Sequence, residues 1–286
     1  MADDHQHVAW VTGASSGIGE ALARALVAEG WAVILSGRRM DALQRLSETL
    51  DAPSLILPFE ATDYDSLPAL VERALAWRGH IDLLINNAGV SQRSLALDTD
   101  FAVYRRLMEI DFLSPLRLTQ LVLPHMVERG AGRIVAISSL AGRIGSPLRT
   151  GYCAAKHALL GYFEALRAEV ELAYGVAVTS VLPGSVRTAV AANAVQGDGS
   201  ARGVSDDNID NGIEPARVAR IILDGIAEGR REIVIAEGAE LHAANLRASD
   251  PERLFDGLAR EGARLAQARA AGGSAFRPDP RRVAPL

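Results

Sequence analysis

Seven short apolar runs, separated by longer amphipathic stretches, constrain the fold of this chain more than any other feature. The runs occupy residues 7–12, 31–36, 54–58, 81–86, 133–138, 176–182 and 232–236. The stretches between them repeat apolar residues near i, i+3, i+4 and i+7, the spacing of a helix with one buried face. Nearly continuous apolar strands that alternate with helices indicate a parallel sheet covered on both faces. We therefore predict an α/β fold, with a doubly wound seven-stranded parallel sheet in one domain.

A glycine-rich turn follows the first apolar run directly and opens the first helical stretch. Its glycines, Gly13, Gly17 and Gly19, stand in the segment VTGASSGIGEAL, and no lysine follows the last of them, which excludes a Walker-type phosphate loop. A dinucleotide site needs a tight turn, a close approach of the backbone to the pyrophosphate, and N–H groups at a helix N-terminus. Many glycine turns serve packing alone, but here strand, turn and helix come in the required order. The segment therefore predicts a Rossmann dinucleotide-binding fold.

The end of the second apolar run indicates which dinucleotide binds. Sites for NAD place an acidic residue there to hold the ribose 2′-hydroxyl, whereas an arginine accommodates a 2′-phosphate. This chain has Arg38 and Arg39 at that point and no acid. Two solvated arginines are the alternative reading, and for Arg39 alone that reading is competitive. We predict NADP(H) as the preferred cofactor, with NAD(H) as the alternative, and no metal centre.

Lys156 is the only lysine in the chain and lies four residues after Tyr152. Residues i and i+4 share one face of a helix, so the phenol and the ammonium project together. An ammonium about 4 Å from the phenol favours the phenolate by roughly 4 kcal/mol at an effective dielectric near 20, before desolvation is subtracted. The phenol then becomes useful for general acid–base catalysis. A chance Tyr–Lys pair on a surface helix is the alternative.

Ser139 directly follows the fifth apolar run, 13 residues before Tyr152. The carboxyl ends of strands are where open α/β sheets place their ligands. A hydroxyl at this point can hold a substrate carbonyl oxygen beside the phenol. The serine therefore argues against a chance pairing of Tyr152 and Lys156.

With these motifs the chain resembles the short-chain dehydrogenase/reductase family over about residues 7–236. TGASSGIG, NNAG (86–89), the Ser139–Tyr152–Lys156 spacing and PGSVRT (183–188) occur in the family's order. The resemblance implies hydride transfer between a nicotinamide and a carbonyl or alcohol carbon. It also implies Tyr152 as the acid/base, Ser139 as the donor that orients the carbonyl, and Lys156 as the anchor of the cofactor ribose.

The resemblance further implies cofactor contacts along much of the chain. They are Gly13, Ser15, Ser16, Gly17, Ile18, Gly19, Arg38, Arg39, Glu60, Ala61, Asn87, Ala88, Gly89, Tyr152, Lys156, Pro183, Gly184, Val186 and Thr188. Within this set Glu60 takes the acidic position beside the adenine, and Asn87 lies near the ribose. Val186 and Thr188 are expected to contact the nicotinamide carboxamide.

One position departs from the family pattern. The family usually has an asparagine in the helix after the fourth strand, where it holds a water of the proton relay, but this chain has Asp111. An ionised carboxylate accepts a hydrogen bond from water but cannot donate one. Two readings stay open: Asp111 is a catalytic residue of the relay, or it is a charge satisfied by a helix kink before Pro115.

Two segments interrupt the alternation of strands and helices. Residues 184–214 are rich in Gly, Asn, Asp and Ser, and a loop of that length within a compact domain is usually functional or disordered. The Ala/Arg-rich tail has weak helical spacing, at Leu254, Leu258 and Leu265. We predict a dinucleotide-binding and catalytic domain over residues 1–249, with a substrate loop at 184–214. We expect residues 250–286 to form a helical, partly flexible extension.

Composition excludes several other classes of protein. The net charge of −5 gives no sign of a nucleic-acid partner, which usually needs a basic face. The N-terminus is acidic before the first apolar run, unlike a secretory signal, and no run approaches the 18 apolar residues of a membrane helix. The single cysteine, Cys153, fits a reducing compartment. We expect a cytoplasmic protein.

The leading hypothesis is an NADP(H)-dependent oxidoreductase that acts on a ketone or a secondary alcohol. The alternative is a non-catalytic dinucleotide sensor or scaffold on the same fold, which would have no reason to keep Ser139, Tyr152 and Lys156 together. Residues 90–98, 140–150 and 184–212 carry apolar residues (Leu95, Leu97, Leu140, Ile144 and Val190) but no obvious charged substrate clamp, apart from Arg93, Arg143 and Arg149. This favours an apolar carbonyl compound as substrate. The family resemblance also implies a homodimer or homotetramer.

Overall fold

Seven parallel strands form one sheet in the computed structural model, which describes residues 6–271. The strands are β1 (Val8–Thr12), β2 (Ala32–Ser36), β3 (Ser54–Ile56), β4 (Leu83–Asn86), β5 (Gly132–Ile137), β6 (Val176–Pro183) and β7 (Glu232–Ile235). Their order across the sheet is β3-β2-β1-β4-β5-β6-β7. Each strand lies within or beside one of the predicted apolar runs, so the prediction of a doubly wound parallel sheet is confirmed.

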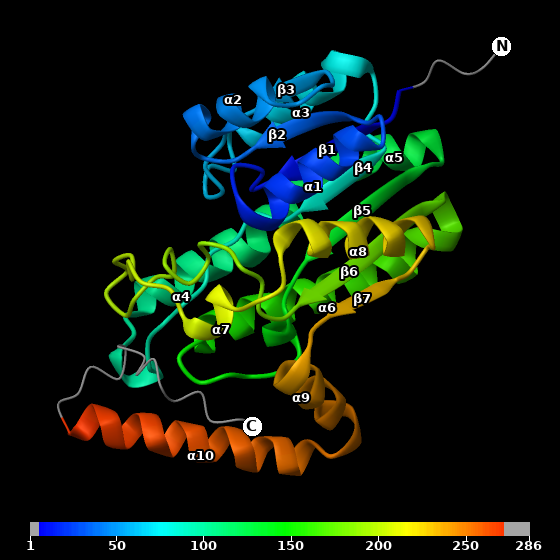
Figure 1. Cartoon of the computed structure of the whole chain (residues 1–286). Coiled ribbons are helices and arrows are strands. Elements are labelled where there is room, and N and C mark those ends of the chain that lie inside the picture. Colours follow the sequence, from blue (N-terminus) through cyan, green and yellow to red (C-terminus); the bar gives the residue numbers. More distant parts are fainter. Residues whose placement is uncertain (1–5, 272–286) are drawn as a thin grey trace.

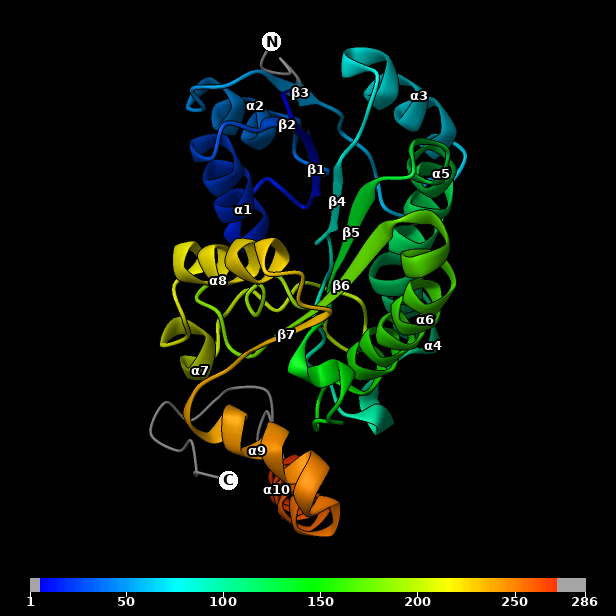
Figure 2. The same ribbon diagram turned by 90° about the vertical axis from the view of Figure 1, so that its right-hand side faces the viewer.

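Helices cover both faces of this sheet (Figures 1 and 2). On one face lie α1 (Gly17–Ala28), α2 (Met40–Glu48) and α8 (Pro215–Ala227), and on the other α3 (Leu67–Arg78), α4 (Phe101–Met108), α5 (Ser114–Arg129) and α6 (Thr150–Tyr174). Successive residues of a strand point to opposite faces. Val8 and Trp10 of β1 therefore join one apolar core, whereas Ala9 and Val11 join the other. This two-sided burial explains why the strands read as continuous apolar runs.

The strand order places a crevice at the carboxyl ends of β1 and β4. From β1 the chain proceeds outward to β2 and β3, and it then crosses back to β4 on the other side of β1. The connections that follow β1 and β4 diverge at this reversal, which is where doubly wound sheets bind ligands. The glycine turn follows β1, and the NNAG segment follows β4.

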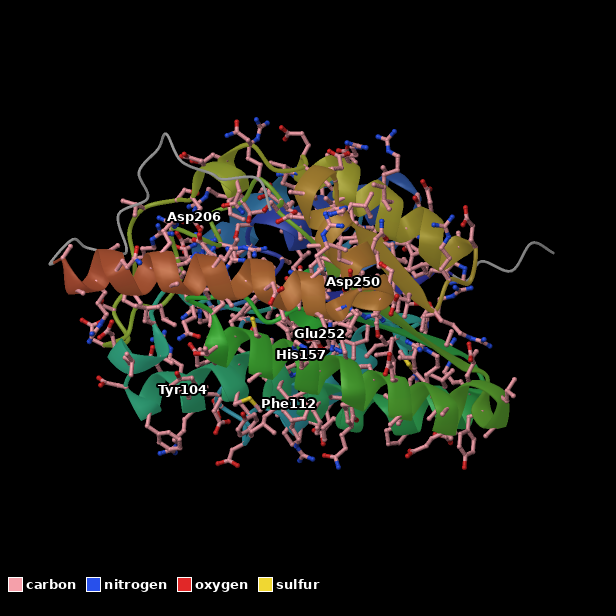
Figure 3. All side chains as sticks on the ribbon, turned by 90° about the horizontal axis from the view of Figure 1, so that it is seen from below. Tyr104, Phe112, His157, Asp206, Asp250 and Glu252 are labelled. Atoms are coloured by element: carbon pink, nitrogen blue, oxygen red, sulfur yellow. The ribbon has the colours of Figure 1, made fainter. Side chains whose placement is uncertain are left out.

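The substrate loop and the last two helices lie at the same end of the molecule (Figure 1). The loop contains the short helix α7 (Asp207–Asp210) and is followed, after α8 and β7, by α9 (Gly238–Ser249) and α10 (Pro251–Ala270). Seen from below, α10 runs between the loop segment that carries Asp206 and the helices α4 and α6 (Figure 3). Leu254 of α10 packs with Ile144 and Ala243, and Arg269 hydrogen-bonds both carboxylate oxygens of Asp98.

The predicted extension over 250–286 thus contains a helix through Ala270, and its residues 272–286 lie outside the described part of the chain. Between residues 6 and 271, the structure contains no helix with the length and apolar character needed to cross a bilayer.

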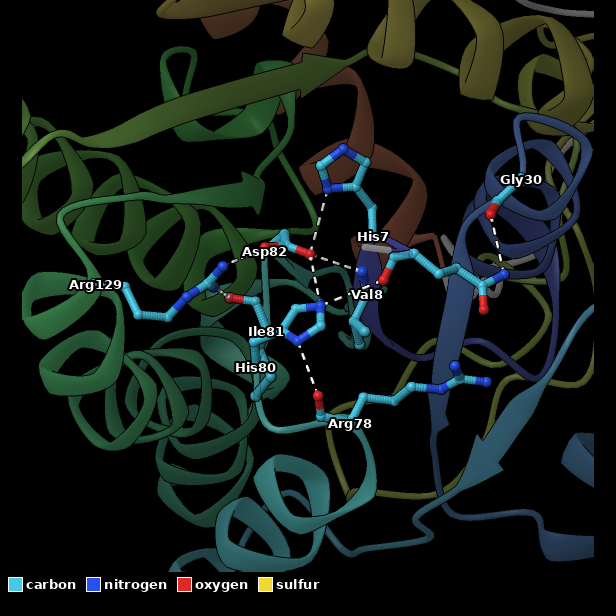
Figure 4. Close-up of polar contacts among 9 residues, drawn as sticks. His7, Val8, Gly30, Arg78, His80, Ile81, Asp82 and Arg129 are labelled. Atoms are coloured by element: carbon cyan, nitrogen blue, oxygen red, sulfur yellow. Dashed lines mark hydrogen bonds and ion pairs between the residues drawn. The ribbon is translucent and has the colours of Figure 1, made fainter. Parts of the chain in front are cut away.

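The opposite, amino-terminal end of the sheet is tied together by Asp82 (Figure 4). Its carboxylate accepts from Val8 N at 2.8 Å and from Arg129 Nη2 at 3.0 Å. The Nε2 atom of His80 lies 3.3 Å from the same carboxylate, and the Nδ1 atom of His7 lies 3.4 Å from it. Burial acts to raise the pKa of Asp82, but the Val8 N–H, Arg129 and His80 outweigh it and hold the pKa below its usual range. One carboxylate therefore joins the starts of β1 and β4 to the end of α5.

Candidate active site

A cavity of about 530 Å³ opens at the crevice between β1 and β4. All but one of the residues predicted to bind cofactor or to act in catalysis line it. They are Gly13, Ser15, Ser16, Gly17, Ile18, Arg38, Arg39, Glu60, Ala61, Asn87, Ala88, Gly89, Asp111, Ser139, Tyr152, Lys156, Pro183, Gly184, Val186 and Thr188. The exception is Gly19. A Cβ on Gly19 would collide with the carbonyl oxygen of Gly13 and lie 2.5 Å from Asn87 Nδ2, so this glycine permits close packing beneath the turn.

The glycine turn has the geometry of a phosphate cradle. Gly13 and Gly17 have φ values of +66° and +61°, a left-handed conformation that side chains other than glycine rarely adopt. A Cβ on Gly17 would lie 2.9 Å from Thr188 Cγ2, so glycine keeps this edge of the cavity open. The turn is also tied to the segment after β4, because Thr12 Oγ1 accepts from Asn87 N at 2.9 Å and from Ala88 N at 3.0 Å. These features fit a bound dinucleotide.

The two arginines after β2 both line the cavity, but the one that contacts the turn is Arg39. Its Nη2 atom donates to the carbonyl oxygen of Ser15 at 3.1 Å and to Ser15 Oγ at 3.2 Å. Arg39 therefore holds the wall of the pyrophosphate turn. Arg38 also lines the cavity, and its expected contact with a ribose 2′-phosphate stays a prediction.

Ser139, Tyr152 and Lys156 converge on the cavity from two elements. Ser139 follows β5 and caps a 3₁₀ turn (Leu140–Gly142), with its Oγ accepting from Ala141 N at 3.1 Å. Tyr152 and Lys156 lie one turn apart on α6, and Lys156 Nζ is 5.7 Å from the centroid of the tyrosine ring. Lys156 is buried and donates to Ile137 O at 3.1 Å. The spacing read from the sequence therefore does place the phenol, the hydroxyl and the ammonium at one cavity.

Asp111 lies in a single π-helical turn (Glu109–Leu113) between α4 and α5, and its side chain is fully buried. One carboxylate oxygen, Oδ1, is 3.3 Å from Lys156 Nζ and accepts from Val90 N at 3.2 Å. The other, Oδ2, has no hydrogen-bond partner among residues 6–271. Burial raises the pKa of Asp111 to about 6, although Lys156 and the Val90 N–H act to lower it. The partners of this charge are therefore Lys156 and a loop N–H, and neither belongs to the helix kink before Pro115.

The start of the substrate loop is clamped by a residue that sequence reasoning missed. Glu240 of α9 accepts from Ser185 N and from Ser185 Oγ, both at 2.7 Å, and Asn208 Nδ2 donates to Ser185 Oγ at 2.7 Å. Because Gly184 and Val186 line the cavity on either side of Ser185, these bonds fix the cavity wall. Glu240 lies 55 residues from Ser185 in a segment without a motif, so no local signal could have found it.

Two of the three arginines in the expected substrate segments, Arg93 and Arg143, form ion pairs with carboxylates. Arg93 is buried and pairs with Asp206 of the substrate loop at 2.6 Å, and Arg143 forms an ion pair with Glu232. Burial lowers the pKa of Arg93 to about 10, with the nearby Arg149 acting in the same direction and Asp206 opposing it. None of the three arginines lines the cavity, whereas Arg106 of α4 does.

Comparison with known proteins agrees with this geometry. The family model described as short chain dehydrogenase matches residues 7–199. The chain belongs to the short-chain dehydrogenase/reductase family. Within this family it is an oxidoreductase that acts on CH–OH groups.

Among its relatives, the human dehydrogenase/reductase SDR family member 7 is 40% identical over 237 residues, which cover 80% of this chain and 70% of the relative. Dehydrogenase/reductase SDR family member 7B of Danio rerio is 39% identical over 254 residues, which cover 86% of this chain and 82% of the relative. A short-chain dehydrogenase/reductase of Burkholderia phymatum, solved in complex with NAD, superposes with a TM-score of 0.78 at 25% identity, covering 88% of this chain and 96% of the other. A short-chain dehydrogenase of Streptomyces avermitilis gives a TM-score of 0.75 at 28% identity, and the superposition covers 94% of this chain and 98% of the other.

Proposed function

We propose that this short-chain dehydrogenase/reductase is an NADP(H)-dependent enzyme that interconverts a ketone and a secondary alcohol, with Tyr152 as its acid/base. The observation that carries the proposal is the shared cavity. Ser139, Tyr152 and Lys156 line the same space as the glycine turn, with the Lys156 ammonium 5.7 Å from the tyrosine ring. A sensor would need the turn but would not need this triad.

The roles of the three side chains follow from their chemistry. When bound, the nicotinamide supplies or accepts the hydride. In the reductive direction Tyr152 donates its phenolic proton to the carbonyl oxygen, and Ser139 Oγ holds that oxygen by a second hydrogen bond. Ser139 Oγ now donates to Pro183 O across 3.4 Å, a long bond that a substrate oxygen can replace. Lys156 stabilises the phenolate that remains, through its positive charge.

We further propose that Asp111 takes part in this chemistry by holding Lys156. Its Oδ1 atom and Ile137 O fix the ammonium from two sides. In its ionised form Asp111 can accept a hydrogen bond but cannot donate one, so it secures the lysine as an ion pair. In this role it replaces the asparagine of the family's proton relay.

The preference for NADP(H) rests on the second strand. No acidic residue follows β2 for a ribose 2′-hydroxyl, and Arg38 and Arg39 both line the cavity there. Replacing Gly37 by Asp together with Arg38 by Leu would add an acid and remove one arginine. We expect the ratio of kcat/KM for NADPH to that for NADH to fall at least tenfold. An unchanged ratio would refute the role of Arg38.

The substrate is proposed to be an apolar carbonyl compound. Beyond the triad, the cavity is lined by Val90, Val190, Val195 and Ile209, and Arg106 also lines it. We also propose that the protein is cytoplasmic and forms a homodimer or homotetramer through the helices in residues 100–129 and 152–174. Phe101 and Leu172, at the ends of these helices, are 76% and 94% exposed. A monomeric mass by light scattering would contradict the oligomer.

The decisive experiment replaces Tyr152 by Phe, which removes the proton and keeps the ring. We expect NADPH affinity to stay within about twofold of the wild type and turnover to fall by about 10² to 10⁴. Oxidation of NADPH with a panel of ketones, followed at 340 nm, measures turnover. Activity of Tyr152→Phe near that of the wild type would overturn the acid/base assignment. A wild-type protein that binds NADPH tightly but turns over no carbonyl compound would favour the sensor.

A further inference from the structure

The first turn of α6, which carries Tyr152, needs hydrogen-bond acceptors from outside the helix. The first N–H groups of an α-helix have no partner within it. Arg149, the residue before α6, provides no side-chain cap. Instead, the amide oxygen Oε1 of Gln92 accepts from Gly151 N at 2.8 Å and from Tyr152 N at 3.2 Å. The catalytic tyrosine is therefore held through its own backbone N–H by a residue of the loop after β4.

Gln92 is itself held rigidly. Its side chain is fully buried, and Nε2 donates to Ser94 Oγ at 3.0 Å and to Thr99 Oγ1 at 3.3 Å. A Cβ on Gly151 would lie 3.2 Å from Gln92 Oε1 and 2.7 Å from Leu107 Cδ1, so the glycine lets the helix end pack closely against the amide. Two backbone N–H groups face one end of the amide, so that end must be the oxygen, and the NH₂ group at the other end has its own acceptors.

The backbone around Gln92 also holds the substrate loop. Gln92 forms a β-bridge with Val195, with Arg93 N donating to Val195 O at 2.9 Å and Val195 N donating to Ser91 O at 2.8 Å. Val195 lines the cavity. Gln92 thus lies between the substrate loop, which the backbone of its neighbours Ser91 and Arg93 holds, and the helix α6, which its own side chain holds.

The neutrality of this cap matters for the chemistry. The N-terminus of a helix carries a partial positive charge, which favours a nearby anion such as the phenolate of Tyr152. An amide oxygen satisfies the N–H groups without a negative charge, whereas a carboxylate in its place would offset that partial charge. The charges around this point include Lys156 on α6, Asp111 on the π turn and Arg149 before α6, together with Asp206 of the substrate loop, which pairs with both Arg93 and Arg202.

We infer that Gln92 is a positioning residue of the active site, which fixes Tyr152 through the N-terminus of α6 and leaves the positive end of the helix uncompensated. The inference rests on the proposed function, because it assigns Gln92 a role in the acid–base step of that reaction.

The test compares two replacements of Gln92. Gln92→Glu keeps the shape and adds a negative charge beside Tyr152 N. We expect the acid limb of the kcat/KM profile for the reverse, alcohol-oxidising reaction to move to higher pH by about one unit. Gln92→Met removes the acceptor and adds no charge. We therefore expect kcat to fall about tenfold, without a shift of the pH profile. Gln44→Glu, on the exposed surface of α2 and outside both the cavity and the proposed oligomer helices, is the matched control for charge and should leave both unchanged.

A readout that does not depend on activity completes the test. In Gln92→Met, hydrogen exchange of the Gly151 and Tyr152 amides should become at least tenfold faster, while the middle of α6 keeps its protection. Unchanged exchange there would overturn the inference, as would a Gln92→Glu profile that coincides with the wild type. If Gln92→Glu does not fold, the exchange and kcat of Gln92→Met decide. An inactive wild type would refute the proposed function instead, and the exchange measurement would still test the cap.

Discussion

Asp82 and Asp111 lie at opposite ends of the sheet and carry their charge in different ways. Asp82, at the amino end, is 15% exposed, and its carboxylate has four partners: the Val8 N–H, Arg129, His7 and His80. Asp111, at the carboxyl end, is fully buried, with Lys156 and one N–H as partners and a second oxygen without any among the described residues. The pKa is held below its usual range at Asp82 and is raised to about 6 at Asp111.

The difference shows that the two carboxylates affect the stability of the fold in opposite ways. A carboxylate surrounded by donors stabilises the fold in its ionised form, because each donor favours the charge. A buried carboxylate with few donors costs stability when it ionises, and such groups gather where chemistry occurs. The amino end therefore serves the fold, and the carboxyl end gives up stability for function.

The largest effect is expected from Lys156→Met, which leaves Asp111 without its counter-ion. A buried charge that loses its partner costs about 3–5 kcal/mol, so the free energy of unfolding should fall by that amount at pH 8. At pH 5 the loss should be much smaller, because Asp111 then takes up a proton. Urea unfolding at both pH values measures the loss. An equal loss at pH 8 and pH 5 would show that the buried charge of Asp111 is not its cause.

A smaller effect is expected from Asp111→Asn, and it concerns the slope of stability with pH. The folded pKa of Asp111, about 6, lies above the unfolded value. Its contribution to stability is therefore fully present below the unfolded pKa and is lost as the pH rises through about 6. Between pH 4.5 and 7 the wild type should lose about 2 kcal/mol relative to the Asn variant. Parallel stability curves for the two proteins would contradict the raised pKa.

Asp82→Asn should have the smallest effect on stability, and the dependence of this effect on pH should have the opposite sign. Its folded pKa is lowered, so its stabilisation is present above the unfolded pKa and is lost as the pH falls through the folded value. We expect the variant to lose about 1.5 kcal/mol at pH 7, since hydrogen bonds to a charged group are weakened. The deficit should shrink below about pH 4, and kcat should not change. A changed kcat would show that the two ends of the sheet are coupled.

The fold could be predicted from the sequence because its signals are local. Each strand is an apolar run buried on both faces, such as Val8–Thr12, and each run is followed by a helical stretch. The triad was accessible for the same reason, since Tyr152 and Lys156 are one helical turn apart. Ser139 was found by its place at the end of a strand.

The remaining contacts of the site join segments that are distant in sequence. Gln92 caps a helix 59 residues later, Arg93 meets Asp206 113 residues later, and Glu240 holds Ser185. Nothing in the residue types near Gln92 indicates which backbone N–H groups its side chain would contact. For Asp111 the sequence revealed that an aspartate replaces the asparagine usual in the family. It could not reveal that this aspartate is buried and paired with Lys156, because both depend on how α6 packs against the π turn.

The burial of Lys156 gives the chain an internal reporter of active-site opening. Reagents that acylate amines need an exposed, neutral amine, and the only ε-amine of this protein is 5% exposed and paired with Asp111. Arginine carries every other permanent positive side-chain charge, so the exterior offers no competing lysine. Acylation at Lys156 must therefore wait for the site to open, and its rate relative to that of free lysine measures the fraction of time spent open. Mass spectrometry of the intact chain would follow this opening, with the wild-type sequence and without an introduced label.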